Sequence, residues 1–163
     1  MATPEPTVQS AMEHALMPSI ASNIQDERMK GKVRVVVVTP EKAFLDSVVD
    51  FVVVPMFDGE LGVLHGRAPL IGRLGAGELR LKTGTTVERW FVDAGFVQIR
   101  SNVVTVLTAH ARKATEVTAD MATKAAADAE AMPSGNIAER SNKAKARDLA
   151  AGMKKVAAKN VTA

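Results

Sequence analysis

Apolar and polar positions alternate through the middle of the chain, in short segments of the kind that form β-strands. The segment Glu78–Thr83 places Leu79 and Leu81 on one face and charged side chains on the other, which is the two-residue period of a strand. Val-rich segments at Val33–Thr39 and Val48–Val54 favour strands that are buried on much of both faces. Further strands are predicted at Val87–Val92, Phe96–Arg100 and Val103–Thr108. Many short strands at close spacing predict an antiparallel sandwich or barrel.

The pattern becomes helical after residue 110, where alanine is frequent and glycine is rare. Thr118 is a suitable N-cap for a first helix, and Pro133-Ser134-Gly135 is expected to end it. Asn136 and Glu139 form an Asn variant of the capping box, which begins a second helix that runs to about Lys159. The predicted fold class is therefore β + α: an N-terminal antiparallel β-sandwich followed by a C-terminal antiparallel two-helix hairpin.

These patterns divide the chain into an N-terminal extension at 1–32, a β-sandwich domain at 33–110 and a helical hairpin domain at 111–163. The extension has little apolar periodicity, so we expect it to be disordered, and Met29 is a candidate for the original start. The second helix has a thin apolar stripe, formed by Ala146, Leu149, Met153 and Val156. Because this stripe buries little area, we expect the hairpin to be mobile or to depend on a partner.

Composition excludes several classes of function. The chain has no Cys, which excludes disulfides, thiolate catalysis and Cys-based zinc sites. Aromatic residues make up only 4% of the chain, which argues against a nucleic-acid reader built on stacked aromatics. The net charge of +3 identifies no partner by itself. No apolar run approaches the roughly 18 residues of a membrane span, so we expect a soluble or peripheral protein.

Catalytic motifs are absent from the sequence, including the P-loop, the Gly-x-Ser-x-Gly elbow and the His-Glu-x-x-His pair. The glycine cluster Gly72–Gly77 lacks the lysine of a phosphate-binding loop and precedes a strand, so we predict a tight sheet connection there. His14, His65 and His110 lie far apart along the chain and predict no metal site. We therefore expect no catalytic residue, no metal and no cofactor, and a binding or structural role.

The segment Asp58–Leu70 carries the strongest functional signal. Asp58-Gly59 and Gly66 predict two bends. We expect four side chains to cluster there at one end of the sandwich: Asp58, Glu60, His65 and Arg67. For an arbitrary protein, the alternative is a solvated loop without a partner.

A resemblance to a known protein family gives this segment a specific functional interpretation. From Gly59 to Leu70 the sequence reads Gly-Glu-Leu-Gly-Val-Leu-His-Gly-Arg-Ala-Pro-Leu. This run resembles the signature of the epsilon-subunit family of bacterial F-type ATP synthases, whose mitochondrial counterpart is the delta subunit. The segment Phe91–Phe96 also falls where the family has its last strands. Two positions depart from the family pattern, since Arg67 stands where many relatives have His and His65 where Pro is common.

The resemblance implies a non-catalytic central-stalk subunit of a proton-translocating ATP synthase. Such a subunit would bind the gamma subunit, rest on the rotor ring of c subunits, couple the ring to the catalytic head and restrain ATP hydrolysis. Its place would be the cytoplasmic side of the bacterial inner membrane, with membrane contact only through the complex and no nucleic-acid partner. The four side chains of the Asp58–Arg67 segment would then contact the rotor ring.

The second helix also carries a basic line at helical spacing, formed by Arg140, Lys143, Arg147 and Lys154. The resemblance implies that this line contacts the alpha and beta subunits through the hairpin, and a solvated helix face is the alternative. Some relatives bind ATP in the hairpin through an Ile-Asp-x-x-Arg-Ala motif. The corresponding segment here is Ile137-Ala138-Glu139-Arg140-Ser141-Asn142, so we expect poor ATP binding.

Two other functions remain open at the level of the sequence. One is a β-sandwich binding module with a helical oligomerisation hairpin, acting in an unrelated soluble assembly. The other is an enzyme whose site forms only between subunits.

Overall fold

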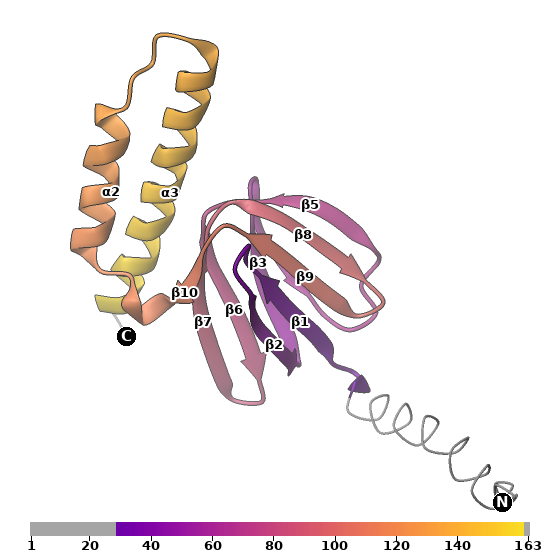
Figure 1. The fold of residues 1–163 in the computed structure, drawn as a ribbon. Coiled ribbons are helices and arrows are strands. Elements are labelled where there is room, and N and C mark those ends of the chain that lie inside the picture. The colour runs from indigo at the N-terminus through magenta and orange to yellow at the C-terminus, as the bar shows by residue number, and fades with distance from the viewer. Residues whose placement is uncertain (1–28, 162–163) are drawn as a thin grey trace, which may run out of the picture. The chain divides into compact units, whose positions relative to one another are not determined.

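The computed structural model describes residues 29–161, in which ten strands precede two α-helices (Figure 1). The sandwich and the hairpin belong to one compact unit that begins at Gly31. The extension predicted at 1–32 falls mostly on residues 1–28, which lie outside the described part of the chain.

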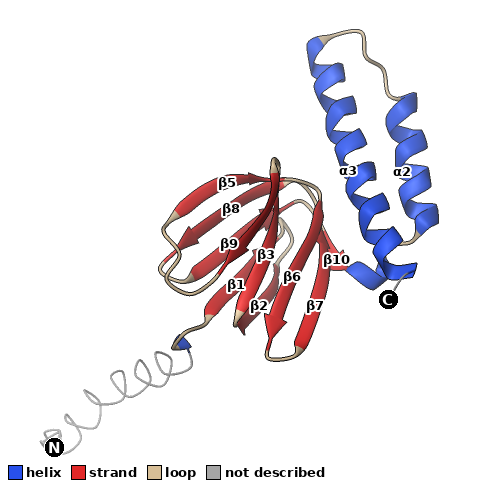
Figure 2. Ribbon diagram, turned by 180° about the vertical axis from the view of Figure 1, so that it is seen from behind, coloured by secondary structure: helices blue, strands red, loops and turns tan. Residues whose placement is uncertain are grey.

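The strands form two layers that share one core. One layer has the order β4 (Gly59–Val63), β3 (Phe51–Met56), β6 (Gly77–Thr83), β7 (Thr86–Val92) and β10 (Ala111–Lys113). The other has the order β5 (Leu70–Leu74), β8 (Gly95–Arg100), β9 (Val103–Thr108), β1 (Val33–Val38) and β2 (Ala43–Val49). Figure 2 shows the β3, β6 and β7 side of the sandwich. The layers join where Met56 of β3 pairs with Leu74 of β5.

The predicted fold class is confirmed, with one addition. Neighbouring strands run antiparallel except β1 and β9, which are parallel. Alternate side chains of the strands point inward. Val97 and Ile99 of β8 are buried on one side as predicted, and so are Leu79 and Leu81 of β6. β1 differs from its prediction, because only the Val33, Val35 and Val37 face is fully buried.

The predicted single strand Val48–Val54 is wrong, because β2 ends at Val49 and β3 begins at Phe51, with Asp50 between them. The Asp50 carboxylate accepts a hydrogen bond from the Gly84 N–H at 2.7 Å and lies 3.3 Å from Lys32 Nζ. These two contacts hold the pKa of Asp50 below its usual range. A charge within an apolar run must reach the surface, so the run divides at that residue.

Four strands were not predicted: β10, β2 apart from Val48 and Val49, and the short strands β4 and β5. β4 occupies part of the segment interpreted as a loop. β5 includes the start of the glycine cluster, so the predicted tight connection to β6 consists of Gly75 and Ala76 alone. β4 and β5 are each five residues long and contain glycine, which weakens the alternation of apolar and polar residues that identifies strands. β10 pairs with β7, so sheet pairing continues past residue 110.

The hairpin follows the 3₁₀ turn η1 (Ala114–Glu116) and consists of α2 (Ala119–Ala131) and α3 (Ile137–Val161). Thr118 Oγ1 accepts a hydrogen bond from the Met121 N–H at 3.2 Å, which confirms the predicted N-cap. The Glu139 N–H donates to Asn136 Oδ1 at 2.8 Å and the Asn136 N–H to Glu139 Oε2 at 3.3 Å. The predicted capping box is therefore formed.

Candidate functional site

The four side chains predicted to cluster between residues 58 and 67 lie at opposite ends of β4. Asp58 lies in the β3–β4 turn and Glu60 is the second residue of β4, whereas His65 and Arg67 follow the end of β4 at Val63. A five-residue strand spans about 17 Å. All four residues are exposed, but the predicted single cluster is not formed.

At the β3–β4 end, Glu60 is paired with a neighbouring strand. Arg80 of β6 donates from Nη2 to Glu60 Oε2 at 2.7 Å and from Nη1 to Oε1 at 3.1 Å. The hydrogen bond to Glu60 raises the pKa of Arg80 above its usual value. Arg80 Nη1 also lies 4.0 Å from Glu78 Oε2, so this end of β4 continues into the contact between sandwich and hairpin.

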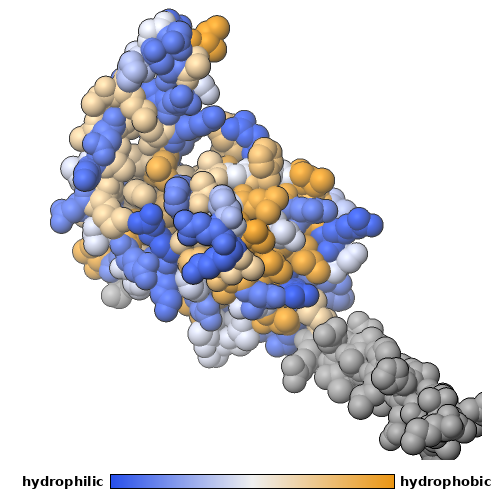
Figure 3. Space-filling view, in the orientation of Figure 1, coloured by the Kyte–Doolittle hydropathy of each residue, from blue (hydrophilic) through white to orange (hydrophobic). Residues whose placement is uncertain are grey.

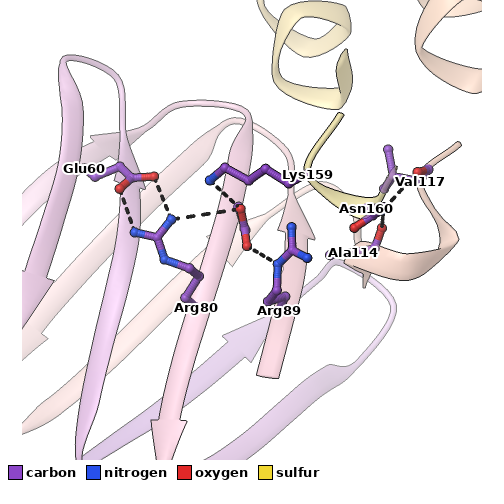
Figure 4. Close-up of polar contacts among 8 residues, drawn as sticks. Glu60, Arg80, Arg89, Ala114, Val117, Lys159 and Asn160 are labelled. Atoms are coloured by element: carbon purple, nitrogen blue, oxygen red, sulfur yellow. Dashed lines mark hydrogen bonds and ion pairs between the residues drawn. The ribbon is translucent and has the colours of Figure 1, made fainter. Parts of the chain in front are cut away.

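Glu78 of β6 joins the sandwich to α3 (Figure 4). Glu78 is only 4% exposed, and its carboxylate accepts hydrogen bonds from Arg89 Nε of β7 and from Lys159 Nζ of α3, the latter at 2.8 Å. Burial raises the pKa of Glu78, but the hydrogen bonds from Arg89 and Lys159 outweigh it and hold that pKa below its usual range. The sequence pattern placed Glu78 on the charged face of β6, and in the structure α3 covers Glu78 on that face.

Close backbone packing accompanies this ion pair. A Cβ added at Gly152 of α3 would lie 2.3 Å from the Ala76 carbonyl oxygen in the β5–β6 connection. Asn160 Nδ2 donates to the carbonyl oxygens of Ala114 at 2.6 Å and Val117 at 3.2 Å (Figure 4). A second apolar cluster fills the space between these contacts: Phe91, Ala114, Val117, Ala122, Met153, Val156 and Ala157. The base of the hairpin is thus docked on the sandwich.

Three members of the basic line join α3 to α2 or to the turn between them. Arg147 donates to both Glu130 carboxylate oxygens at 2.8 and 2.7 Å, and its hydrogen bond holds the pKa of Glu130 below the usual range. Lys143 Nζ donates to the carbonyl oxygens of Glu130 and Met132 at 2.7 and 3.0 Å. Arg140 Nε donates to the Ser134 carbonyl oxygen at 3.1 Å.

Lys154, the fourth member of the line, borders a groove between α2 and α3 whose lining is mostly alanine. The partners of Arg147 and Lys143 were not predictable from spacing along α3, because such spacing reports contacts within one helix. The partners lie on the other helix of the hairpin. Arg147 and Lys143 are thus already bonded within the hairpin when it has this conformation.

The outer side of β5, β8 and β9 carries neighbouring apolar side chains, which we call the apolar face: Ile71, Phe96 and Leu107. Their exposed fractions are 75%, 56% and 48%. Phe96 pairs with Leu107, and Leu107 pairs with the half-buried Val38 of β1. Figure 3 shows hydrophobic residues gathered over this part of the sandwich. Contiguous exposed apolar surface of this kind marks interaction sites.

The two described histidines contact polar neighbours. His65 Nε2 lies 3.1 Å from Asn102 Nδ2, and His110 Nδ1 lies 3.0 Å from Asp93 Oδ2. His14 lies outside the described residues. Between residues 29 and 161, His, Asp and Glu side chains do not gather in groups of three that could hold a metal ion. Neither α2 nor α3 combines the length and hydropathy of a transmembrane helix.

Comparison with known proteins identifies the family. Residues 32–114, about half of the chain, match the model of the ATP synthase, Delta/Epsilon chain, beta-sandwich domain. The chain belongs to the ATP synthase delta/epsilon family. An ATP synthase epsilon chain from Rhodopirellula baltica is 57% identical over 102 residues, which are 63% of this chain and 80% of that relative. One from Granulibacter bethesdensis is 46% identical over 96 residues, 58% of this chain and 71% of the relative.

Solved structures share the delta/epsilon fold. A chain of the Euglena gracilis mitochondrial ATP synthase, in a structure of OSCP, F1 and c-ring, aligns with a TM-score of 0.66 and 21% identity, over 77% of this chain and 81% of that one. A chain of the Tetrahymena thermophila mitochondrial ATP synthase, in a structure of the central stalk and c-ring, aligns with a TM-score of 0.56 and 18% identity. The alignment covers 77% of this chain and 96% of that one. At these identities the likeness establishes the fold.

The residues that join the two parts of this delta/epsilon chain were not predicted from the sequence. Glu78 and Lys159 are 81 positions apart, and no local pattern links them. Gly152 did carry a signal, because an isolated glycine inside a long helix commonly has a packing reason. Asn102 was not singled out either, although its side chain contacts the segment that resembles the family signature.

Proposed function

We propose that this chain is a non-catalytic epsilon subunit of the central stalk of an F-type ATP synthase. In this role it joins the rotor ring to the catalytic head and restrains ATP hydrolysis. The observation that carries the proposal is the 57% identity to an ATP synthase epsilon chain over 80% of that relative's length. Its place would be the cytoplasmic side of a bacterial inner membrane, held there by the other subunits.

The gamma subunit is the proposed partner of the apolar face. Ile71, Phe96 and Leu107 lie on paired strands of a rigid sheet, so they present a fixed surface. Arg73 lies beside Phe96 in the strand register and adds a cation to its edge. An apolar centre with an arginine at its border is the composition of protein–protein interfaces.

A charge within the apolar face should weaken binding to gamma. The variant Phe96→Glu would place a carboxylate at the centre of the proposed contact, and we expect co-purification with gamma to fall at least about tenfold. Val87→Glu is the matched control, since Val87 is 50% exposed but lies on β7 in the other layer. Equal retention of gamma by both variants would contradict this assignment.

Contact with the rotor ring is proposed for the Asp58–Arg67 segment. The two ends of β4 offer different surfaces: Asp58 and Glu60 at one end, His65 and Arg67 at the other. About 17 Å of strand separates them, so we expect one end to make the closer contact. The alpha and beta subunits are proposed partners of the hairpin through Arg140, Lys143, Arg147 and Lys154.

Restraint of hydrolysis by the hairpin requires these basic side chains to exchange partners. In the docked hairpin, Arg147 and Lys143 bond to α2, and Lys159 bonds to Glu78. Contact of Arg147 and Lys143 with the catalytic head would therefore compete with their hydrogen bonds to α2. Membership of the delta/epsilon family leaves no support for the alternative of an unrelated soluble assembly.

A further inference from the structure

A tight turn follows β4, from Leu64 to Arg67. The Arg67 N–H donates to the Leu64 carbonyl oxygen at 3.3 Å, and Gly66 has φ +79°. Positive φ at the third residue is the mark of a type II turn. The Gly66 N–H takes no part in the turn's own hydrogen bond, so it can donate to an acceptor outside the turn.

Asn102, from the β8–β9 turn, supplies that acceptor. Its Oδ1 accepts the Gly66 N–H at 2.7 Å, and its Nδ2 lies 3.1 Å from His65 Nε2. Because the Gly66 N–H requires an oxygen, the orientation of the amide is settled, and Nδ2 donates to the unprotonated Nε2 of His65. One side chain thus holds two consecutive residues of the turn.

Asn102 is itself held in place by its backbone. It has φ +61° within the Ser101–Asn102 turn, and its carbonyl oxygen accepts from the Arg34 N–H of β1 at 2.9 Å. Leu64, at the start of the neighbouring turn, is 59% exposed, and Arg67 at its end is exposed too. A surface turn with an exposed apolar side chain and an exposed cation is therefore anchored to the sheet through one amide.

We propose that Asn102 is a positioning residue that sets the shape of the Leu64–Arg67 turn before a partner binds. A loop that is already in its bound shape loses less conformational entropy on association. That the partner is the rotor ring rests on the proposed function. The clamp itself is a property of the isolated chain and is measured without the complex.

Hydrogen exchange at the Gly66 amide tests the clamp. The variant Asn102→Gly removes the side chain and tolerates the positive φ, and we expect Gly66 to exchange about fivefold faster, the factor that one net hydrogen bond of about 1 kcal/mol provides. Asn102→Asp keeps an oxygen acceptor and should restore protection. Ser101→Gly makes the same backbone change in the same turn, at φ +50°, and should leave Gly66 exchange unchanged.

Equal Gly66 exchange in the Asn102→Gly and wild-type chains would overturn the clamp. Equally fast Gly66 exchange in the Ser101→Gly and Asn102→Gly chains would also overturn the clamp, because the change in exchange would then come from the backbone and not from the Asn102 side chain. The melting temperature of each variant distinguishes a loosened turn from a loosened sandwich. The clamp is supported if both glycine variants lower the melting temperature equally and only Asn102→Gly raises the rate of Gly66 exchange.

Cross-linking in the assembled complex tests what the turn is positioned for. With Arg67→Cys as reporter, adding Asn102→Gly should lower the cross-linking yield to the ring at least about threefold while the chain remains in the complex, and Asn102→Asp should restore it. An unchanged yield alongside faster Gly66 exchange would overturn the role in positioning but leave the clamp intact. Absence of the chain from the complex, with the clamp demonstrated, would count against the proposed function instead.

Discussion

Gly152 lies where α3 passes closest to the sandwich, and an added Cβ there would lie 2.3 Å from the Ala76 carbonyl oxygen. The obstacle is backbone, which cannot rotate away as a side chain can. Two polar contacts join the same elements: Lys159 donates to Glu78, and Asn160 donates to the carbonyl oxygen of Ala114. Docking of the hairpin therefore depends on the absence of a side chain at Gly152 and on these polar contacts, beside the apolar cluster that includes Phe91 and Met153.

The variant Gly152→Ala should displace α3 from the sandwich. Although alanine favours a helix over glycine by about 1 kcal/mol, the clash should weaken docking by about 1–3 kcal/mol. The methyl NMR signal of Met153, which packs in the cluster with Phe91, would report the change. Gly135→Ala is the matched control, since the nearest atom to its added Cβ is a carboxylate oxygen of Glu139, 3.2 Å away on a flexible side chain. An unshifted Met153 signal in Gly152→Ala would contradict the assigned contact.

Docking should also weaken in acid through Glu78. The hydrogen bonds from Arg89 and Lys159 lower the pKa of Glu78 below its ordinary value of 4.5. The ionised carboxylate therefore stabilises docking fully above that ordinary value, and the contribution is lost as the pH falls through the lowered pKa.

Replacement of Glu78 tests this pH dependence. The variant Glu78→Gln should lose about 1–2 kcal/mol of docking at neutral pH and show a flatter response of the Met153 signal to acid. Glu88→Gln, which alters an exposed residue of β7, is the control. A wild-type acid response in Glu78→Gln would assign the dependence to another group.

At the scale of elements, the hairpin is two helices fastened to each other by their basic side chains. Arg147 of α3 donates two hydrogen bonds to the Glu130 carboxylate of α2, and Lys143 donates to carbonyl oxygens at the end of α2. Replacing all four basic residues would therefore alter the hairpin itself as well as its charge. Lys154 offers a cleaner change, because it borders the groove between the helices.

The variant Lys154→Glu should raise ATP hydrolysis by the assembled complex about twofold to fivefold, the range expected from losing one exposed ion pair. The reason is that the proposed contact with acidic segments of the head would become repulsive. Lys145→Glu makes the same change about 180° around α3 and should leave the rate unchanged. If both variants hydrolyse ATP at the wild-type rate, with normal subunit composition, Lys154 has no part in restraint.

The hairpin should bind ATP only weakly. Ala138 stands where ATP-binding relatives have Asp, and the carboxylate of Glu139 is occupied by the N–H groups of Gly135 and Asn136. Calorimetry on the isolated chain should give no dissociation constant in the micromolar range. A micromolar value would show that other residues of the hairpin form the nucleotide site.

Elements whose signals are local were predictable from the sequence. Thr118 and the Asn136–Glu139 box define helix starts through contacts within three residues, and the alternation in β6 and β8 identifies their buried faces. The burial of Glu78 was not predicted, because the helix that covers it, α3, is distant in sequence. Asp58 and Arg67 were grouped because β4 between them contains two glycines, which hid a strand that carries them apart.

At the scale of the whole molecule, the proposed contacts lie on separate surfaces. The apolar face covers β5, β8 and β9, the Leu64–Arg67 turn lies beside the β8–β9 turn, and α3 docks on the β5–β6 connection. A chain with several separate contact surfaces is suited to joining several subunits. Stable incorporation into the complex is therefore the property on which the whole account depends.

Cysteines at Glu60 and at Arg67 should show which end of β4 faces the ring. Because about 17 Å of strand separates the two ends, one of the two variants should cross-link to a ring subunit with the greater yield. The other should react more slowly or with a different subunit. Efficient cross-linking of both only to the beta subunit would contradict the proposed ring contact.

The most direct measurement is the subunit stoichiometry of the complex that contains this chain. An affinity tag on the chain should isolate, from detergent-solubilised membranes, an assembly with alpha, beta, gamma and c subunits. Native mass spectrometry should find one copy of the chain for each gamma subunit. Recovery of the chain without gamma, while an intact ATP synthase lacking this chain remains in the same membranes, would contradict its assignment to the central stalk.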